Sequence, residues 1–199
     1  MLGFNKSNDY RMGYQITAIY KIAMHKKDLG LLYNIKNLFA VGKITKHGDN
    51  SIQYVVRSLA ELQIILSHFD KYPLLSEKWG DYKLFKDGLE LIKTKAHLNK
   101  EGFNKILFMR AALNLGLSDE LKLSFPYIEA VKKPVVQNTD NMNPYWIAGL
   151  ASGDGCFYLS FRNSLTTKSG KSVTLKFHIV QDSRGYRANE IINILPKLW

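Results

Sequence analysis

The sequence predicts an α+β fold built from two copies of one unit, and three observations support this prediction. Stretches in which polar and apolar residues alternate, as in half-buried strands, are followed by stretches with helical periodicity. The sequence is similar to itself when it is shifted by 157 residues without a gap. Its composition, with 46% hydrophobic and 23% charged residues, is that of a globular protein long enough to bury a core.

The first copy begins with two predicted strands. Residues 2–4 and 15–24 alternate polar and apolar side chains, and the polar residues 5–13 between them form a hairpin loop. Asp28 is the expected N-cap of the helix that follows, because apolar residues recur after it at helical spacing. A strand pair followed by an amphipathic helix is therefore the first building block.

A second hairpin and four helices complete the first copy. Strands at 43–47 and 53–57 flank a turn rich in Gly, Asp and Asn. Ser58 and Glu61 have the spacing of a capping box, which predicts a helix that reaches about His68. Three further helices are predicted. The first spans residues 77–97, with Trp79, Leu84, Phe85, Leu89 and Ile92 on its buried side. The second follows an N-cap at Asn99, and the third spans residues 118–124.

A polar segment separates the two copies. Residues 129–143 combine lysines, a proline and a run of amide side chains, a composition typical of a linker. We therefore expect a first domain over 1–128, a linker over 129–143 and a second domain over 144–199.

An unusual helix opens the second copy. Asn143 is a favourable N-cap, and Pro144 fits the first helical position. Small residues spaced four apart would let another helix approach closely; they are Ala148, Gly149, Ser152 and Gly153. Asp154 falls at the negative end of this helix, which costs about 0.3–1 kcal/mol without a compensating cation. Taken alone, Asp154 fits either an Asp-Gly turn or a metal-binding carboxylate.

The second copy continues with two more strands, over 158–162 and 173–181, and these show the repeat most clearly. The matched positions include Leu2/Leu159, Phe4/Phe161, Gly13/Gly170, Thr17/Thr174 and Ile22/Ile179. At this offset, the counterpart of Asp154 lies before Met1, and Trp199 corresponds to residue 42. The first small-residue helix is thus expected to be missing and the second copy to be incomplete.

The charge of the chain indicates a polyanionic partner. The formal net charge is +11, which favours nucleic acid. No apolar run approaches the roughly 20 residues that cross a bilayer, so no membrane partner is expected. Cys156 is the single cysteine, which excludes an internal disulfide, and we expect it to be a small apolar filler. The five histidines lack the spacing of metal ligands.

Residues 147–155, Ile-Ala-Gly-Leu-Ala-Ser-Gly-Asp-Gly, resemble the LAGLIDADG motif, with Ser152 in place of its first acid. Residues 14–28, 69–74 and 113–122 are similar to the same family, the single-chain, two-repeat homing endonucleases of fungal mitochondrial introns. This resemblance implies two αββαββα repeats with saddle-like antiparallel sheets. It also implies that two motif helices pack together through their small residues.

The resemblance further implies a site. Asp154 would be the catalytic acid and a ligand of Mg²⁺ in metal-assisted phosphodiester hydrolysis. The solvent-exposed, polar faces of the strands would lie in the major groove of a double-stranded DNA target at an intron-insertion site. Strand alternation gives the candidate DNA-binding residues Asn5, Arg11, Gln15, Thr17, Lys21, Lys43, Thr45, Gln53, Arg57, Ser160, Arg162, Lys168, Ser172, Thr174, Lys176 and His178.

The implied function is site-specific double-strand DNA cleavage in intron homing, in the mitochondrion. The alternative is an RNA-binding maturase that assists splicing of its host intron, because the same fold and a basic surface suit both roles. With a single motif helix, these 199 residues are expected to cleave weakly or not at all. A second motif helix would come from an upstream, exon-encoded sequence or from another chain.

Overall fold

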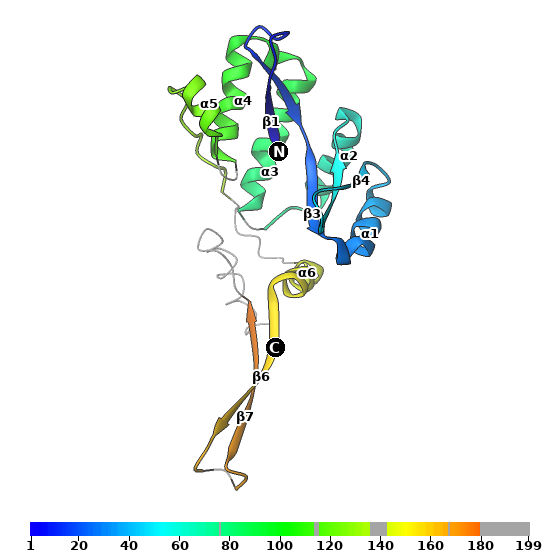
Figure 1. The fold of residues 1–199 in the computed structure, drawn as a ribbon, viewed down its shortest axis with the longest axis vertical. Coiled ribbons are helices and arrows are strands. Elements are labelled where there is room, and N and C mark those ends of the chain that lie inside the picture. Colours follow the sequence, from blue (N-terminus) through cyan, green and yellow to red (C-terminus); the bar gives the residue numbers. More distant parts are fainter. Residues whose placement is uncertain (76, 114–115, 136–142, 167, 180–199) are drawn as a thin grey trace. The chain divides into compact units, whose positions relative to one another are not determined.

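The computed structural model describes residues 1–75, 77–113, 116–135, 143–166 and 168–179 (Figure 1). The chain divides into two compact units, Met1–Val135 and Val136–Trp199. Both combine α-helices with antiparallel strands, which confirms the predicted α+β class.

Unit 1 contains two small antiparallel sheets. Strands β1 (Leu2–Lys6) and β2 (Tyr14–Ala18) form the first sheet. Strands β3 (Tyr20–His25), β4 (Lys43–Lys46) and β5 (Ser51–Val56) form the second, in the order β3-β5-β4.

The predicted single strand over 15–24 is wrong, because the chain passes from one sheet to the other at Ile19. The backbone N–H of Ile19 donates to Met1 O at 2.9 Å, and Ile19 O accepts from the Met1 amino group at 2.6 Å. From Tyr20 onward the partner is β5, with Tyr20 opposite Val56. The alternation of side chains continues across this change of partner, so the sequence pattern does not reveal it.

Two helices cover the apolar face of the first sheet. These are α3 (Lys78–Lys93) and α4 (Lys100–Ala112). Gly88 brings α3 against the sheet, since a Cβ there would lie 2.7 Å from a methyl group of Leu2. Phe103 of α4 meets the ring of Phe4 edge-on, with centroids 5.7 Å apart. Both Leu2 and Phe103 are buried as a result.

The second sheet packs against α1 (Leu29–Phe39), and α2 (Leu59–Lys71) packs against α3. The ring of Tyr54 is fully buried and stacks on Phe39 at 6.3 Å. Its hydroxyl donates to Val41 O at 3.0 Å, which satisfies the one polar group that this aromatic pair buries.

Several predicted helix details change in the structure. Helix α3 ends at Lys93 rather than residue 97, because Lys95 adopts a left-handed conformation before the 3₁₀ helix Ala96–Leu98. Trp79 is half-buried, not buried, and Lys83 Nζ lies 5.8 Å from its ring centroid. The capping box does not form: Ser58 makes no side-chain cap bond, and Glu61 accepts from Gly42 N at 3.5 Å.

Other predicted caps are confirmed. The side chain of Asn99 accepts from Gly102 N at 2.7 Å at the start of α4. Ser118 accepts from Leu121 N at 3.4 Å at the start of α5 (Asp119–Ser124). Asp28 occupies the predicted N-cap position of α1, but its side chain makes no cap hydrogen bond, and a 3₁₀ helix over Lys26–Asp28 precedes α1.

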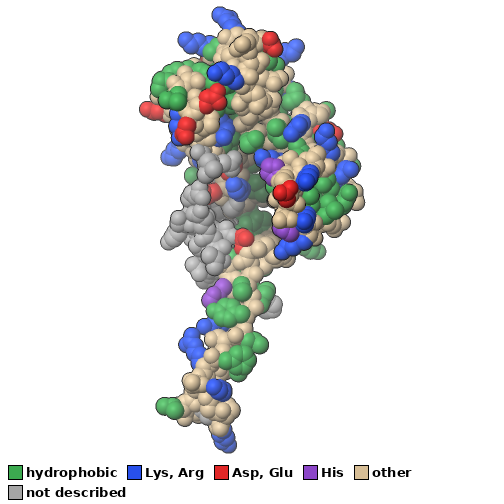
Figure 2. Space-filling model, in the orientation of Figure 1, with side chains coloured by type: hydrophobic (Ala, Val, Ile, Leu, Met, Phe, Trp, Pro, Cys, Tyr) green, Lys and Arg blue, Asp and Glu red, His purple; other side chains and the backbone are tan. Residues whose placement is uncertain are grey.

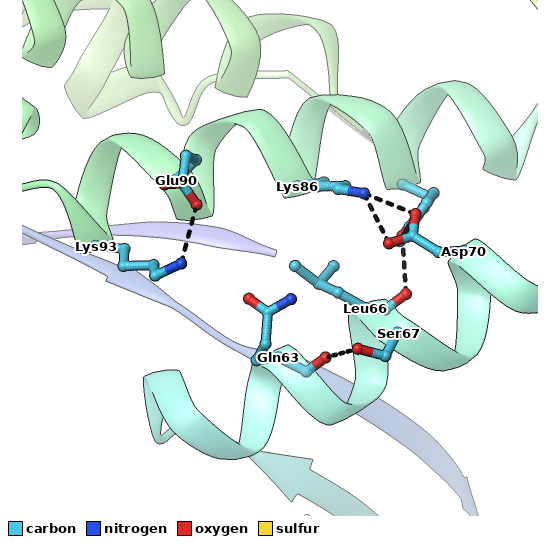
Figure 3. A network of polar contacts seen from close by, with 8 residues as sticks. Gln63, Leu66, Ser67, Asp70, Lys86, Glu90 and Lys93 are labelled. Atoms are coloured by element: carbon cyan, nitrogen blue, oxygen red, sulfur yellow. Dashed lines mark hydrogen bonds and ion pairs between the residues drawn. The ribbon is translucent and has the colours of Figure 1, made fainter.

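A polar network joins α2 to α3 (Figure 3). The carboxylate of Asp70 accepts from Tyr82 Oη and from Lys86 Nζ, each at 2.7 Å. The hydrogen bond from Lys86, then that from Tyr82, lowers the pKa of Asp70 below its usual value. The Tyr82 Oη also lies 3.0 Å from Leu66 O, so its one hydrogen is shared between that carbonyl and Asp70, and the network ties a side chain of α3 to the backbone of α2.

Part of the predicted linker belongs to unit 1. Val131 N donates to Phe108 O at 3.3 Å, and Lys133 Nζ lies 2.7 Å from a carboxylate oxygen of Asp81. The boundary between the units falls between Val135 and Val136, inside the predicted linker. The domain limits 1–128 and 144–199 stay a prediction.

Unit 2 contains α6 (Pro144–Asp154) followed directly by β6 (Gly155–Asn163) and β7 (Lys171–Ile179). The two strands form an antiparallel hairpin in which Leu159 lies opposite Leu175. Of the predicted strand 173–181, residues 180 and 181 lie outside the described residues, as do all later positions of the repeat.

The Phe103 ring anchors the core of unit 1, so its removal should be costly. Replacing Phe103 by Ala is expected to destabilise the protein by about 3–5 kcal/mol, because it leaves a cavity beside Phe4. Urea unfolding followed by circular dichroism measures this. The control, Leu123→Ala, changes a side chain that is 83% exposed and should shift the midpoint little. Equal effects of the two substitutions would contradict the assigned core.

The Asp70 network predicts a pH-dependent contribution to stability. Because the folded-state pKa of Asp70 is lowered, its contribution is present above the unfolded-state value near 4 and is lost as pH falls through the folded-state pKa. Asp70→Asn should therefore cost about 0.5–1 kcal/mol at pH 7, and progressively less as the pH falls through the folded-state pKa. The control Glu90→Gln removes only the exposed pair with Lys93 (Figure 3). A cost for Asp70→Asn that does not change with pH would refute this.

Candidate nucleic-acid interface and metal ligand

The polar face of the first sheet groups three candidate residues. Asn5 lies directly opposite Gln15, and Thr17 lies opposite Gly3 on the same face. The amide of Gln15 donates to Tyr10 Oη at 3.1 Å, so Tyr10 from the hairpin loop belongs to this surface, although it is not among the candidates predicted from the sequence. The hydroxyl of a tyrosine can hydrogen-bond to nucleic acid, but nothing in the sequence pattern places Tyr10, a loop residue, next to the strand.

The second sheet presents four candidates on one face. Lys21 and Lys43 flank Val55 from the two neighbouring strands. Thr45 lies opposite Gln53, whose amide donates to Thr45 Oγ1 at 3.2 Å. The face therefore carries two lysines, with the buried Val55 between them, beside a hydrogen-bonded pair of polar side chains.

The structure brings candidates from both sheets together at one cavity. Asn5 and Thr17 of the first sheet and Arg57, which follows β5, line a cavity of about 470 Å³. Lys21 instead lines a different, largely apolar cavity of about 630 Å³ that includes Arg110 and Asp81. Arg11 stands apart in the loop between β1 and β2.

The polar face of the β6–β7 hairpin carries the candidates of unit 2. Its cross-strand pairs are Cys156/His178, Tyr158/Lys176, Ser160/Thr174 and Arg162/Ser172. Lys168 lies in the connecting turn. Basic side chains are exposed along this hairpin in the space-filling view (Figure 2).

Two residues of this face were not assigned to it from the sequence. Tyr158 Oη lies 3.4 Å from His178 Nε2, and Lys176 Nζ lies 5.6 Å from the tyrosine ring centroid. Cys156 is exposed opposite His178, so its predicted role as a buried filler is wrong. Because β6 begins at Gly155, every even-numbered residue from 156 to 162 shares the polar face, and this parity is the signal that would have found both.

The two units present matching faces. At the offset of 157 residues, Thr17 corresponds to Thr174, Asn5 to Arg162 and Gln15 to Ser172. All six lie on the polar side of their hairpins. The repeat thus places hydrogen-bonding and basic side chains on the same side of both copies.

Helix α6 exposes its small-residue face. The side chain of Asn143 caps it by accepting from Tyr145 N at 3.0 Å, which confirms the predicted start. The predicted packing residues are all exposed; they are Ala148, Gly149, Ser152 and Gly153. A Cβ built at Gly149 or Gly153 would meet no atom within 4 Å, so no neighbour in the described structure requires glycine there.

Asp154 is the last residue of α6, and its side chain is exposed. At the next residue, Gly155, the backbone lies close to the last turn of α6, since a Cβ there would lie 2.3 Å from Ala151 O. A carboxylate oxygen is the donor that hard divalent cations prefer, so Asp154 fits as one ligand of such an ion. Within the described residues there is no group of three or more His, Cys, Asp or Glu that could hold a metal. Water, a phosphate and a further acid would have to complete the coordination.

None of the helices in the described part of the chain is long and apolar enough to cross a membrane.

Comparisons with known proteins agree with this arrangement. The LAGLIDADG endonuclease family model matches residues 2–89. The chain is 37% identical over 179 residues to a Neurospora crassa protein described as "Probable intron-encoded endonuclease 3", covering 88% of this chain. It is 54% identical over 102 residues, half of this chain, to an "Uncharacterized 50.9 kDa protein in ND4 intron 1" of Podospora anserina.

A solved structure shares the fold. I-SmaMI, bound to an uncleaved DNA target in the presence of calcium ions, superposes with a TM-score of 0.86 at 39% identity, over 96% of this chain.

The relatives are longer than this chain. It covers 33% of the Neurospora protein, 23% of the Podospora protein and 66% of I-SmaMI. The similarity nevertheless extends through almost all of the present sequence. By its motif, its fold and these similarities, the chain belongs to the LAGLIDADG endonuclease family.

Proposed function

We propose that this chain is part of a site-specific, double-strand DNA endonuclease of intron homing, encoded and acting in the mitochondrion. The observation that carries the proposal is the shared polar face of the two hairpins, with Asp154 at the end of the helix that leads into the second one. The net charge of +11 suits a polyanionic duplex.

The strand faces would bind DNA in the major groove. The guanidinium groups of Arg57 and Arg162 can each bond the O6 and N7 atoms of a guanine, and the amides of Gln15 and Gln53 suit adenine. The lysines would contact phosphates, which position the duplex without reading its sequence. The Lys176–Tyr158–His178 cluster keeps a cation and two hydrogen-bonding groups on the surface next to α6.

Asp154 would hold a divalent cation, Mg²⁺ under physiological conditions, at the scissile phosphate. When bound, Mg²⁺ supplies Lewis-acid stabilisation of the charge that develops on the phosphate. The chain's own contribution is to fix the carboxylate at the end of α6, while Gly155 turns the backbone directly into β6. One carboxylate supplies too few ligands, so the proposal includes a second motif helix with its own acid.

The exposed face of α6 would receive that second helix. Gly149 and Gly153 leave room for close backbone contact, and Ser152 replaces a charge that the interface would have to bury. The second helix would come from an upstream segment or from another chain.

The comparisons favour cleavage over the RNA-binding alternative. The Neurospora relative is described as a probable intron-encoded endonuclease, and I-SmaMI was solved bound to a DNA target. The intron location of the Podospora relative also supports the proposed mitochondrial intron origin.

DNA binding by the strand faces should depend on salt in a residue-specific way. Lys43→Ala should weaken binding to all duplexes and reduce the slope of log K against log salt by about 1. Arg162→Ala should cost about 1–3 kcal/mol and relax the preference at one base pair. Fluorescence anisotropy on duplexes selected from a randomised library measures both. Lys93→Ala, on α3, is the control; an equal loss there would contradict the assigned interface.

Cleavage should require a second motif helix. The 199-residue chain should cut selected duplexes weakly or not at all with Mg²⁺, whereas a form with a second copy of residues 143–158 placed before Leu2 should nick or cut them. Asp154→Asn in the extended form should reduce the rate by at least about 10³ and leave DNA affinity unchanged. Asp119→Asn is the control.

Two results would count against the enzymatic proposal. Robust cutting by the unextended chain would refute the need for two helices. An extended form that binds DNA without cleaving it would refute hydrolysis as the function.

A further inference from the structure

One row of three side chains crosses the polar face of the second sheet. Ala23 of β3 lies opposite Gln53 of β5, and Gln53 lies opposite Thr45 of β4. Side chains directly opposite each other on neighbouring strands have Cβ atoms about 4.5–5.5 Å apart, so each member of the row adjoins the next. Ala23 is exposed, and Gln53 and Thr45 are half-buried. The row is therefore accessible from the face that we propose for DNA.

The amide of Gln53 is held in one orientation within this row. Its Nε2 donates one hydrogen to Thr45 Oγ1 at 3.2 Å. On the other flank of Gln53 lies Ala23, whose methyl group forms no hydrogen bond of this kind. Because one Nε2 hydrogen is used by Thr45, the second Nε2 hydrogen and Oε1 are left for a ligand. The row thus presents a donor and an acceptor side by side.

This donor and acceptor are complementary to adenine. The major-groove edge of adenine carries the N7 acceptor and the N6 amino donor, and one glutamine amide can bond both. An amide turned over, with Oε1 accepting from the Thr45 hydroxyl, would present two N–H groups and would suit the two acceptors of guanine. The hydrogen bond to Thr45 therefore determines which purine Gln53 prefers.

Ala23 extends the match to the partner base. Across the major-groove edge of an A·T pair, the groups follow in the order adenine N7, adenine N6, thymine O4 and thymine C5-methyl. The row has the same order, with Nε2 on the Thr45 side, Oε1 directed away from Thr45, and the methyl group of Ala23 on the far flank. Two strand spacings, about 10 Å, separate Thr45 from Ala23, which fits within a groove about 12 Å wide.

We propose that this row reads one A·T base pair, in which Gln53 contacts adenine, Ala23 contacts the thymine methyl group, and Thr45 is the positioning residue of the Gln53 amide. The inference rests on the proposed function, since it requires this face to lie in the major groove. Lys21 and Lys43 belong to the neighbouring row of the same face. Their contacts with phosphates would hold the duplex over Gln53.

The test measures equilibrium binding rather than cleavage, with the complete 199-residue chain. Duplexes are selected from a randomised library, and the same selection with Gln53→Ala identifies the base pair whose preference this residue sets. Changes of single groups in the DNA then probe each contact at that pair. 7-Deazaadenine removes the N7 acceptor, and deoxyuridine in place of thymidine removes the C5-methyl group. Neither change affects the folding of the protein.

The selection should yield A·T at the base pair set by Gln53, with a preference of about tenfold over the other pairs. 7-Deazaadenine should weaken binding of the wild-type chain about fivefold and should not weaken binding of Gln53→Ala. Deoxyuridine should weaken wild-type binding about fourfold, because it removes one apolar contact of methyl size. The same change should have no effect on Ala23→Gly.

The positioning role has its own test. Thr45→Val keeps the shape of the side chain and removes the hydrogen-bond acceptor. It should reduce the adenine preference at this one pair about fivefold and leave the preferences at the other pairs unchanged. Thr45→Ser, which keeps the hydroxyl, should restore the preference. The matched control is Thr94→Val, because the Thr94 hydroxyl, directly after α3, donates to Glu90 O at 2.8 Å. It should change no preference.

The outcomes separate this inference from the proposed function. A selection that enriches no duplex would overturn both. A selected site whose preferences are the same with Gln53→Ala would overturn this inference alone, as would a G·C pair at the position that Gln53 sets. Equal preferences of Thr45→Val and the wild-type chain would contradict the positioning role of Thr45. Binding that is insensitive to deoxyuridine would contradict the contact of Ala23 with thymine.

Discussion

The burial of one face of the β1–β2 hairpin under helices determines which of its side chains are available for the proposed contact with nucleic acid. In unit 1, α3 and α4 cover Leu2 and Ile16, and this leaves Asn5 and Thr17 on the opposite face. Because side chains alternate along a strand, a shift of one residue would bury the polar set and expose the apolar one. The interface is therefore specified by the core and not by the polar residues themselves.

Much of this arrangement could be predicted from local sequence patterns. The alternation of the strands, the caps at Asn99 and Asn143, and the position of Asp154 at a helix end all follow from short-range rules. Features that depend on distant partners were predicted incorrectly. The break at Ile19 depends on where Met1 and β5 lie. The capping box at Ser58 does not form, and the side chain of Glu61 instead accepts a hydrogen bond from Gly42 N.

The residues of the candidate site could be predicted from the sequence about as well as the fold. The parity of the strands identifies most of the polar faces and would also have placed Tyr158, but Tyr10 joins them through a contact with Gln15 that no spacing rule gives. Unit 2 also shows the limit of such rules, because both the small-residue face of α6 and the apolar face of its hairpin are exposed. Their patterns specify packing surfaces without specifying the partner that packs on them.

The central claim is that the polar strand faces of both units contact the same DNA duplex. Photocrosslinking tests it most directly, with a photoreactive amino acid placed in turn at Thr17, Ala18, Thr174 and Leu175, which alternate between the two faces. The account predicts crosslinks to a bound duplex from positions 17 and 174 and none from positions 18 and 175. Crosslinks from the apolar positions, or from one unit alone, would contradict it.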